Sequence, residues 1–222
     1  MIVHRLDPAA KVAATLAFVV AVVATPRGAW WAFLGDAAVL AVVVAAARLP
    51  APWVLRRLRI ELPFLAFAAL LPVVGDADAA TATTLVAKAT LGVGAAVVLA
   101  GTTPVAELLV GLERLRVPRV LVAIAGFMVR YLDVVAGEAS RMRIARLSRG
   151  ADPRWLWQSR AIASTAGALF VRSYERGERV HLAMLSRGYA GTMPVLHDRA
   201  PARGDWLAAG PPIVAAAMAL LA

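Results

Sequence analysis

Few residues of the chain have the types and spacing needed to catalyse a reaction or to bind a nucleotide or a metal. A P-loop nucleotide site needs a Gly-Lys-Ser/Thr run so that the lysine reaches the phosphates, whereas the two lysines, Lys11 and Lys88, both follow alanine. No nucleophile–base motif such as Gly-x-Ser-x-Gly occurs. The three histidines stand far apart and accompany no cluster of Asp, Glu or Cys, which predicts no metal site; they are His4, His181 and His197. We therefore expect a chain without catalytic residues, metal or bound cofactor.

Three glutamates could in principle act as acid–base groups: Glu138, Glu175 and Glu178. Each has arginines at helical spacing, a pattern typical of ion pairs on a helix surface. We predict that these glutamates are ion-pair partners rather than catalytic groups.

One short motif occurs twice, each time at the end of a predicted helix. The segment 141–150 carries Arg-x-x-x-Ala-x-Leu-Ser-Arg-Gly, and the segment 179–188 repeats it 38 residues later. A glycine just past a helix and an arginine in its last turn are general features of helix ends, but they do not explain six matching positions at a fixed offset. Two equivalent arginine-tipped helix ends predict docking onto two equivalent surfaces, such as the halves of a dimeric or pseudo-dimeric partner. The motif residues are Ser148, Arg149, Gly150, Ser186, Arg187 and Gly188, supported by Arg141, Ala145, Arg179 and Ala183.

The composition places these helices in a membrane protein. Hydrophobic residues make up 61% of the chain and charged residues 17%, whereas soluble proteins average about half apolar and about a quarter charged. The net charge of +10 comes from 24 Lys and Arg, of which only two are lysines, against 14 acids. Such a charge suits an anionic membrane face, an acidic partner protein or nucleic acid. Cysteine is absent, which excludes disulfides and thiolate metal sites.

Five apolar stretches predict membrane-spanning helices. The first follows Asp7-Pro8, a pattern typical of a helix N-cap with proline at the first helical position. No Ala-x-Ala-like cleavage site follows it near residues 20–30, so we interpret it as a permanent span rather than a signal peptide. A span needs roughly 20 residues, with about 17 as the lower limit, so the first, third and fifth stretches are expected to extend into their flanks. The stretches are 12–25, 29–47, 62–74, 81–100 and 206–222.

A basic block separates the fourth stretch from the fifth. Residues 104–205 hold 16 Arg and nine acids, and their apolar residues keep a helical period broken at Pro104, Pro118 and Asp152-Pro153. The predicted fold is therefore all-α: a polytopic membrane protein with about five transmembrane helices and a cytoplasmic platform of amphipathic coupling helices. The expected domains are 1–103, with four transmembrane helices, 104–205, with the coupling helices, and 206–222, with the C-terminal transmembrane helix.

The distribution of arginine orients the spans. Lys11, the segment 48–61 and the block 104–205 fall on one side, whereas Arg27 and the acidic turn 75–78 fall on the other. Because Lys and Arg mark the cytoplasmic side, we expect a multi-pass protein of the cell inner (plasma) membrane with its N-terminus in the cytoplasm and its C-terminus outside. A sixth span would place the C-terminus on the same side of the membrane as the N-terminus.

Four arginines of the segment 48–61 lie next to predicted spans, which favours contact with anionic membrane lipids. Nucleic-acid binding is disfavoured, because the basic residues lie on helices tied to membrane spans and no recognised DNA- or RNA-binding module occurs. The four arginines are Arg48, Arg56, Arg57 and Arg59.

Two charged residues lie inside predicted spans, Asp36 in the second and Lys88 in the fourth. Each lies seven residues from the outer end of its span, at a depth of roughly 10 Å for a rise of about 1.5 Å per residue. A charge facing lipid is costly, so one hypothesis is an interhelical ion pair between them. The alternative is that Lys88 reaches outward to the interface while Asp36 meets a hydroxyl group or water.

The sequence resembles a known family, the transmembrane (T) component of energy-coupling factor transporters, in its cobalt subfamily. The resemblance covers nearly the whole chain, and the run 172–179 followed by the second Ser-Arg-Gly and Tyr189 is its most specific part. The family's two short motifs are most often Ala-Arg-Gly, and serine here replaces alanine by another small residue. The remaining segments that carry the resemblance are 4–8, 28–31, 127–131, 141–143 and the first Ser-Arg-Gly.

The resemblance implies that the two Ser-Arg-Gly helix ends dock into grooves of two ATP-binding-cassette subunits. Closure of those subunits on nucleotide would move the platform, and the platform would reorient a separate substrate-binding membrane subunit, which in cobalt systems captures the metal ion. A conventional ABC importer permease that lines its own pathway is the alternative, but it usually presents one coupling helix per subunit rather than two. A membrane-bound enzyme is disfavoured by the missing catalytic residues. Similarity favours cobalt as substrate, then nickel, then a vitamin.

Overall fold

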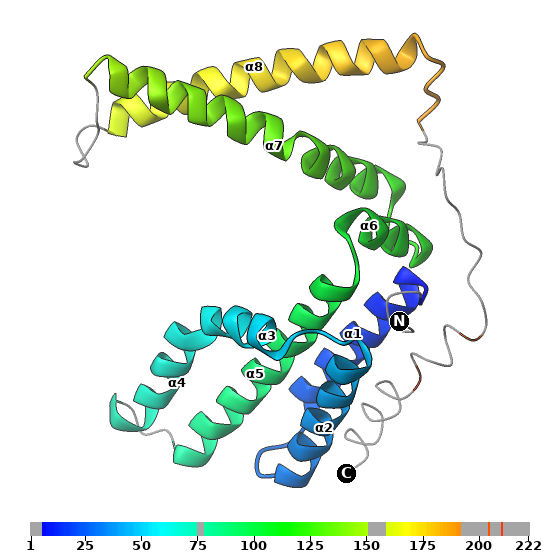
Figure 1. Ribbon diagram of the computed structural model, residues 1–222, viewed down its shortest axis with the longest axis vertical. Helices are drawn as coiled ribbons and strands as arrows, with labels where there is room; N and C mark the ends of the chain where they lie inside the picture. The colour runs from blue at the N-terminus through cyan, green and yellow to red at the C-terminus, as the bar shows by residue number, and fades with distance from the viewer. Residues whose placement is uncertain (1–5, 75–77, 151–158, 192–203, 205–209, 211–222) are drawn as a thin grey trace. The chain divides into compact units, whose positions relative to one another are not determined.

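The computed structural model describes residues 6–74, 78–150 and 159–191, together with Gly204 and Gly210, and these residues form helices and connecting turns (Figure 1). They divide into two compact units, the first made of Met1–Val117 with Arg199–Ala222 and the second of Pro118–Asp198. The first unit contains α1 (Pro8–Ala24), α2 (Trp30–Ala46), α3 (Ala51–Leu58), the 3-10 turn η2 (Arg59–Glu61), α4 (Leu62–Val74), α5 (Ala79–Thr102) and α6 (Val105–Arg114). The second contains α7 (Arg119–Ser148) and α8 (Ser159–Leu185). The all-α prediction is confirmed, whereas the predicted fifth stretch, 206–222, lies outside the described residues apart from Gly210.

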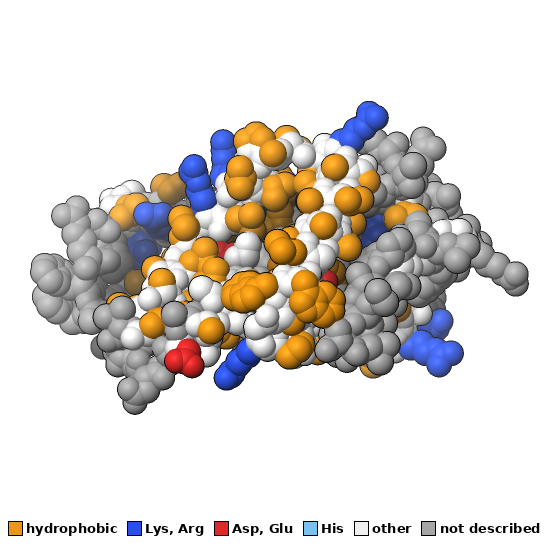
Figure 2. Space-filling view, turned by 90° about the horizontal axis from the view of Figure 1, so that it is seen from below, with side chains coloured by type: hydrophobic (Ala, Val, Ile, Leu, Met, Phe, Trp, Pro, Cys, Tyr) orange, Lys and Arg blue, Asp and Glu red, His pale blue; other side chains and the backbone are white. Residues whose placement is uncertain are grey.

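Helices α1, α2 and α5 form the apolar core of the first unit. Phe18 and Val22 of α1 pack with Phe33 of α2 and with Leu91 and Ala95 of α5. The outward faces of the same helices are apolar as well, and hydrophobic side chains predominate on the described surface of this unit in Figure 2. Leu34 is 71% exposed and Val42 is 68% exposed. Apolar side chains of this number on the outside of a helical bundle suit a surface that faces lipid.

Two helices are long and apolar enough to cross a membrane, judged by length and composition among the described residues: α5, over Ala80–Thr102, and α7, over Arg119–Ser148. α1 and α2 are shorter apolar helices of 17 residues each, at the lower limit of about 17 for a span. α4 has 13 residues and contains Pro72. α7 falls in the block for which the sequence predicted cytoplasmic helices, so its length and composition are also compatible with a sixth span. The domain bounds and the orientation of the termini stay predictions.

The start of α1 is joined to the ends of α5 and α6. Asp7 caps α1, because its Oδ1 accepts a hydrogen bond of 2.7 Å from the amide of Ala9, as the Asp-Pro pattern predicted. The other carboxylate oxygen of Asp7 pairs with Arg114 at the end of α6. The Lys11 ammonium donates to the Thr102 carbonyl, 3.4 Å away, in the last turn of α5. These buried polar contacts fix α6 at the point from which the chain continues into the second unit.

Of the two hypotheses for Asp36 and Lys88, the ion pair is not formed in the structure. The Lys88 ammonium donates a hydrogen bond of 2.6 Å to the carbonyl of Val23, and no ion pair among the described residues joins Lys88 to Asp36. The carbonyls of the last helical turn lack partners within their own helix, so Lys88 of α5 satisfies the end of α1. Asp36 is 2% exposed, and its Oδ2 has no hydrogen-bond partner among the described atoms.

Gly111 decides how closely α6 can approach α1. A Cβ atom at this position would lie 2.9 Å from the carbonyl carbon of Pro8 and 3.0 Å from the amide nitrogen of Ala9. Backbone atoms cannot turn away as a side chain can, so we predict that Gly111→Ala destabilises the protein by about 1–3 kcal/mol, as overpacking does. The measurement is thermal unfolding in detergent. Gly92→Ala in α5 is the control: a Cβ there meets nothing within 4 Å, and the change should be neutral or stabilising by up to about 1 kcal/mol. Equal behaviour of the two variants would contradict the close α1–α6 contact.

Candidate functional site

The two copies of the repeated motif end their helices in the same way. The backbone φ angle is +76° at Gly150 and +81° at Gly188, the left-handed region that favours glycine. Their amides donate to the carbonyls of Leu147 and Leu185, each 3.0 Å away. After the second motif the Tyr189 amide also reaches the Met184 carbonyl at 3.0 Å, which completes a Schellman cap. The predicted role of the two glycines at the helix ends is confirmed.

The serine of each motif folds back onto its own helix. The Ser148 hydroxyl donates to the Ala145 carbonyl at 3.0 Å, and the Ser186 hydroxyl donates to the Ala183 carbonyl at 2.9 Å. These contacts use the serines within the helix end and leave Arg149 and Arg187 exposed beside it. The structure therefore presents two matching helix ends, each with an exposed arginine at the negative end of the helix dipole.

Both supporting arginines of the motif are exposed on their helices. Arg179 forms an ion pair of 3.9 Å with Glu175 one turn earlier, as the helical spacing predicted. The guanidinium of Arg141 lies over Gly137, because a Cβ at Gly137 would be 3.5 Å from Arg141 Nη1. No described contact tests the prediction for Glu178.

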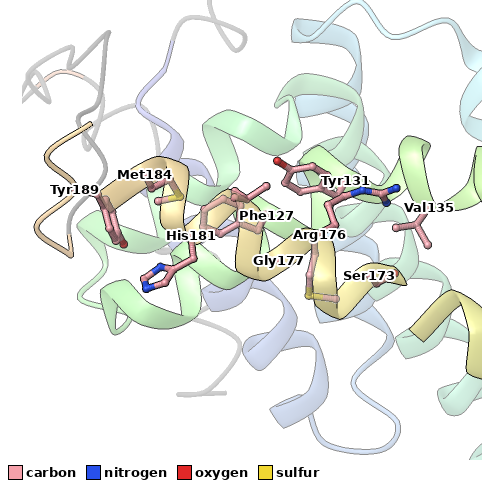
Figure 3. Close-up of a pocket in the computed structure, with 11 residues that line it drawn as sticks. Phe127, Tyr131, Val135, Ser173, Arg176, Gly177, His181, Met184 and Tyr189 are labelled. Atoms are coloured by element: carbon pink, nitrogen blue, oxygen red, sulfur yellow. The ribbon is translucent and has the colours of Figure 1, made fainter. Parts of the chain in front are cut away.

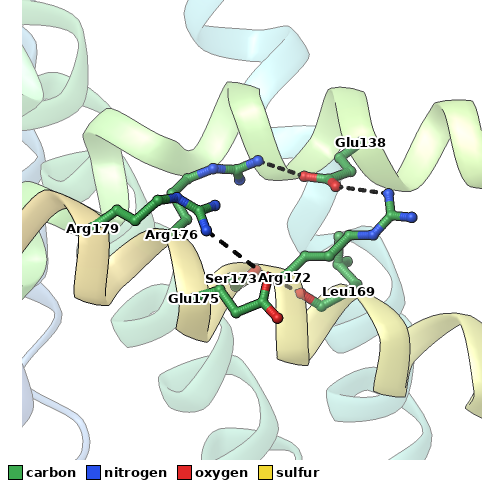
Figure 4. Close-up of polar contacts among 7 residues, drawn as sticks. All are labelled: Glu138, Leu169, Arg172, Ser173, Glu175, Arg176 and Arg179. Atoms are coloured by element: carbon green, nitrogen blue, oxygen red, sulfur yellow. Dashed lines mark hydrogen bonds and ion pairs between the residues drawn. The ribbon is translucent and has the colours of Figure 1, made fainter.

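Glu138 joins α7 to α8. Its carboxylate accepts from Arg172 Nη1 at 3.1 Å and from Arg176 Nη2 at 2.8 Å (Figure 4). The prediction that Glu138 pairs with an arginine is confirmed, but the partners lie on the other helix rather than at helical spacing on its own. The hydrogen bonds from Arg176 and Arg172 hold the pKa of Glu138 below its usual range. A further contact, from Arg146 Nη1 to the Thr165 hydroxyl at 3.4 Å, joins the same two helices.

A groove of about 500 Å³ lies between α7 and α8 (Figure 3). Most of its lining is apolar or aromatic, and the rings of Phe127 and Tyr131 stack 6.4 Å apart on its α7 side. Arg176 lines this groove and also binds Glu138. Its Nη1 has no hydrogen-bond partner among the described atoms. The sequence did not predict the groove, although Met128, Tyr131 and Val135 share the helical face of α7 that the apolar period marks. The other lining residues are Ser173, Gly177, Val180, His181, Met184 and Tyr189.

The two motifs lie at opposite ends of the second unit. α8 starts beside the end of α7 and carries the second motif to its far end, as Figure 1 shows. With 27 residues and a rise of about 1.5 Å per residue, α8 holds the two helix ends on the order of 40 Å apart. Among the described residues no group of three or more His, Cys, Asp or Glu could hold a metal ion. The arrangement is suited to binding two partner surfaces at a fixed separation.

The model of a protein family described as "CbiQ: Cobalt transport protein" matches residues 1–196. The cobalt transport protein CbiQ of Rhodobacter capsulatus is 37% identical over 123 residues, 54% of this chain and 49% of that protein. The putative fused cobalt transport protein CbiMQ of Methanocorpusculum labreanum is 33% identical over 92 residues, 41% of this chain and 15% of that protein. The energy-coupling factor transporter transmembrane protein EcfT of Thermanaerovibrio acidaminovorans is 30% identical over 239 aligned positions, 94% of this chain and 87% of that protein. The chain thus spans half or less of the first two relatives and most of the third.

Gly188 needs a residue that accepts a positive φ. We predict that Gly188→Val destabilises the end of α8 by at least about 1–2 kcal/mol although it removes no charge, because β-branched residues disfavour the left-handed region. Gly188→Asn should destabilise the helix end much less than Gly188→Val, since asparagine tolerates this conformation. Thermal unfolding checks both variants. The control is Gly167→Val, at an ordinary helical position of α8 where a Cβ meets nothing within 4 Å; a loss as large in the control would contradict the capping role.

Glu138 should make the stability of the second unit depend on pH. A carboxyl group whose pKa is lowered by folding stabilises the protein above its unfolded pKa of about 4.3, and this contribution is lost as pH falls through the lower folded pKa. We predict that Glu138→Gln lowers the melting temperature by a few degrees at neutral pH, and that the difference from wild type shrinks below about pH 4. The measurement is thermal unfolding of both proteins across this pH range. Glu175→Gln is the control, because the Glu175–Arg179 pair is exposed and should contribute little.

Proposed function

Since the chain belongs to the cobalt transport protein (CbiQ) family, we propose that it is the energy-coupling transmembrane subunit of an ATP-driven importer. In this proposal two ATPase subunits bind the helix ends at Arg149 and Arg187. Their closure on nucleotide moves α7 and α8 together, and that motion reaches a separate substrate-binding membrane subunit. The chain itself contributes no catalytic residue, and ATP and Mg stay on the partner ATPases.

The observation that carries this proposal is the equivalence of the two helix ends. Both have a left-handed glycine, a serine folded back onto the helix and an exposed arginine. Two matching surfaces at a fixed separation suit a partner that is a dimer or a pseudo-dimer. The ion pairs of Glu138 support the transmission of motion, because they tie α7 to α8.

Cobalt is the substrate that we propose, with nickel as the next candidate and a vitamin as the third. The Rhodobacter and Methanocorpusculum relatives are named as cobalt transport proteins, and the fused relative supports a close association with another transporter subunit. The EcfT relative is named for energy coupling. The proposed orientation in the cell membrane, with the N-terminus in the cytoplasm, rests on the positions of the arginines.

A conventional ABC importer permease is the second candidate, because such a protein also presents a cytoplasmic helix to an ATPase. It would line its own pathway and would not need a separate binding subunit. Transport assays in cells that lack the candidate binding subunit separate the two functions. Uptake that persists without that subunit would favour the permease.

The decisive variant reverses both exposed arginines. Loss of one partner from a buried charged pair costs about 3–5 kcal/mol, so Arg149→Glu combined with Arg187→Glu should weaken assembly with the ATPases by at least about 100-fold. Coupled ATP hydrolysis should be lost, while the isolated chain still inserts into the membrane. Copurification with the ATPase subunits and ATPase activity of the complex are the measurements.

The control for this variant is Arg27→Glu combined with Arg130→Glu, which makes the same change in net charge at two exposed arginines outside the motifs. This control should assemble and hydrolyse ATP as the wild type does. Normal transport by the Arg149→Glu, Arg187→Glu protein would rule out docking through the two helix ends.

A further inference from the structure

The short helix α3 and the turn η2 are seated on the end of α5. A Cβ atom at Gly101 would lie 2.8 Å from the Trp53 ring and 3.2 Å from the Leu49 side chain. These two residues therefore pack directly on the α5 backbone, and only glycine leaves them room. The contact fixes α3 at the level where α5 ends and where Lys11 meets Thr102.

Four arginines lie in the same segment as Leu49 and Trp53, and all are exposed: Arg48, Arg56, Arg57 and Arg59. No ion pair among the described residues involves any of them. The carboxylate nearest to them in sequence, Glu61, is turned inward: it is 4% exposed, and its Oε1 accepts a hydrogen bond of 3.3 Å from the Thr90 hydroxyl of α5. The carboxylate that could have neutralised these arginines thus contacts another helix instead.

Large apolar side chains lie among the same arginines. Ile60 is 83% exposed, Leu55 is 63% exposed and Leu62 is 57% exposed. A short helix that presents arginines together with exposed leucine and isoleucine is suited to the boundary between lipid headgroups and acyl chains. An aqueous surface does not suit the exposed leucine and isoleucine, and the interior of a bilayer does not suit the arginines.

Arg57 is held in an orientation that suits phosphate binding. Its guanidinium carbon lies 4.4 Å from the centre of the Trp53 ring. Stacking on an aromatic face holds the planar group in place and leaves its N–H groups free to donate, and guanidinium groups bind phosphate oxygens in a bidentate manner.

We propose that α3 and η2 form a binding surface for anionic phospholipids. Arg56, Arg57 and Arg59 contact the headgroup phosphates, while Leu55 and Ile60 insert beside the first acyl carbons. The charge of this surface selects anionic over zwitterionic lipid, and the adjacent apolar residues select a lipid over a free phosphate ion. The surface belongs to the chain itself, so the proposal does not depend on the energy-coupling function.

The test uses the full-length chain, purified without partner subunits, in nanodiscs of phosphatidylcholine mixed with phosphatidylglycerol. Native mass spectrometry after release into detergent measures the ratio of the two lipids that stay bound. Each arginine near an anionic surface contributes a comparable part of the attraction, so Arg56→Gln, Arg57→Gln and Arg59→Gln together should lower the retained phosphatidylglycerol by at least about tenfold. A matched control, Arg27→Gln, Arg130→Gln and Arg143→Gln, removes the same charge from exposed positions elsewhere and should retain the wild-type ratio.

Three results would overturn the proposal. They are an unchanged ratio in the α3 variant, an equal loss in the control, and displacement of phosphatidylglycerol by millimolar inorganic phosphate, which would indicate a simple anion site. If the triple variant does not fold, the single variants Arg56→Gln and Leu55→Gln replace it. Arg56→Gln should lower the ratio through the headgroup, and Leu55→Gln should lower the total amount of retained lipid through the acyl boundary. An unchanged ratio in the first variant together with unchanged total lipid in the second would also reject the lipid surface.

Discussion

The carboxylate of Glu138 is the interaction on which the second unit depends. Two arginines of α8 bind its two oxygens, so one buried side chain determines how α7 and α8 are aligned. A carboxylate shared by two guanidinium groups resists sliding, because a shift of one helix along the other would break both pairs and leave a buried charge without partners. The alignment in turn places the Ser-Arg-Gly ends at the two ends of the unit and opens the groove between Tyr131 and His181.

Buried polar contacts also hold the first unit together, where the start of α1 meets the ends of α5 and α6. Asp7 caps α1 and also pairs with Arg114, and Lys11 caps the end of α5. Lys88 likewise satisfies a carbonyl at the end of α1. Where a membrane excludes water, helix ends and charged side chains must find partners within the protein. Asp7, Lys11 and Lys88 therefore connect the helices of this unit.

Apolar surface left uncovered is the second constraint on the protein. Side chains such as Leu34 and Val42 in the first unit and Phe170 and Leu182 in the second are more than half exposed. An apolar surface of this kind needs lipid or other subunits to cover it. Membership of a transporter family agrees with this physical requirement.

The sequence by itself determined the apolar helices and the ends marked by local signals, because a helix cap depends on contacts within about four residues. Asp7-Pro8 starts α1, and Gly150 and Gly188 end their helices, whereas the helix α3 was not predicted. The sequence could not determine which distant groups meet. Equal depth in two spans suggested a pair of Asp36 with Lys88, yet a free carbonyl at the end of α1 lay within reach of the lysine. Helical spacing likewise suggested a partner for Glu138 on its own helix, whereas the antiparallel packing of α7 and α8 brought two arginines to it from 34 and 38 residues away. Only the tertiary structure decided these partners, because the strength of a polar contact depends on which groups burial brings together and not on their distance along the chain.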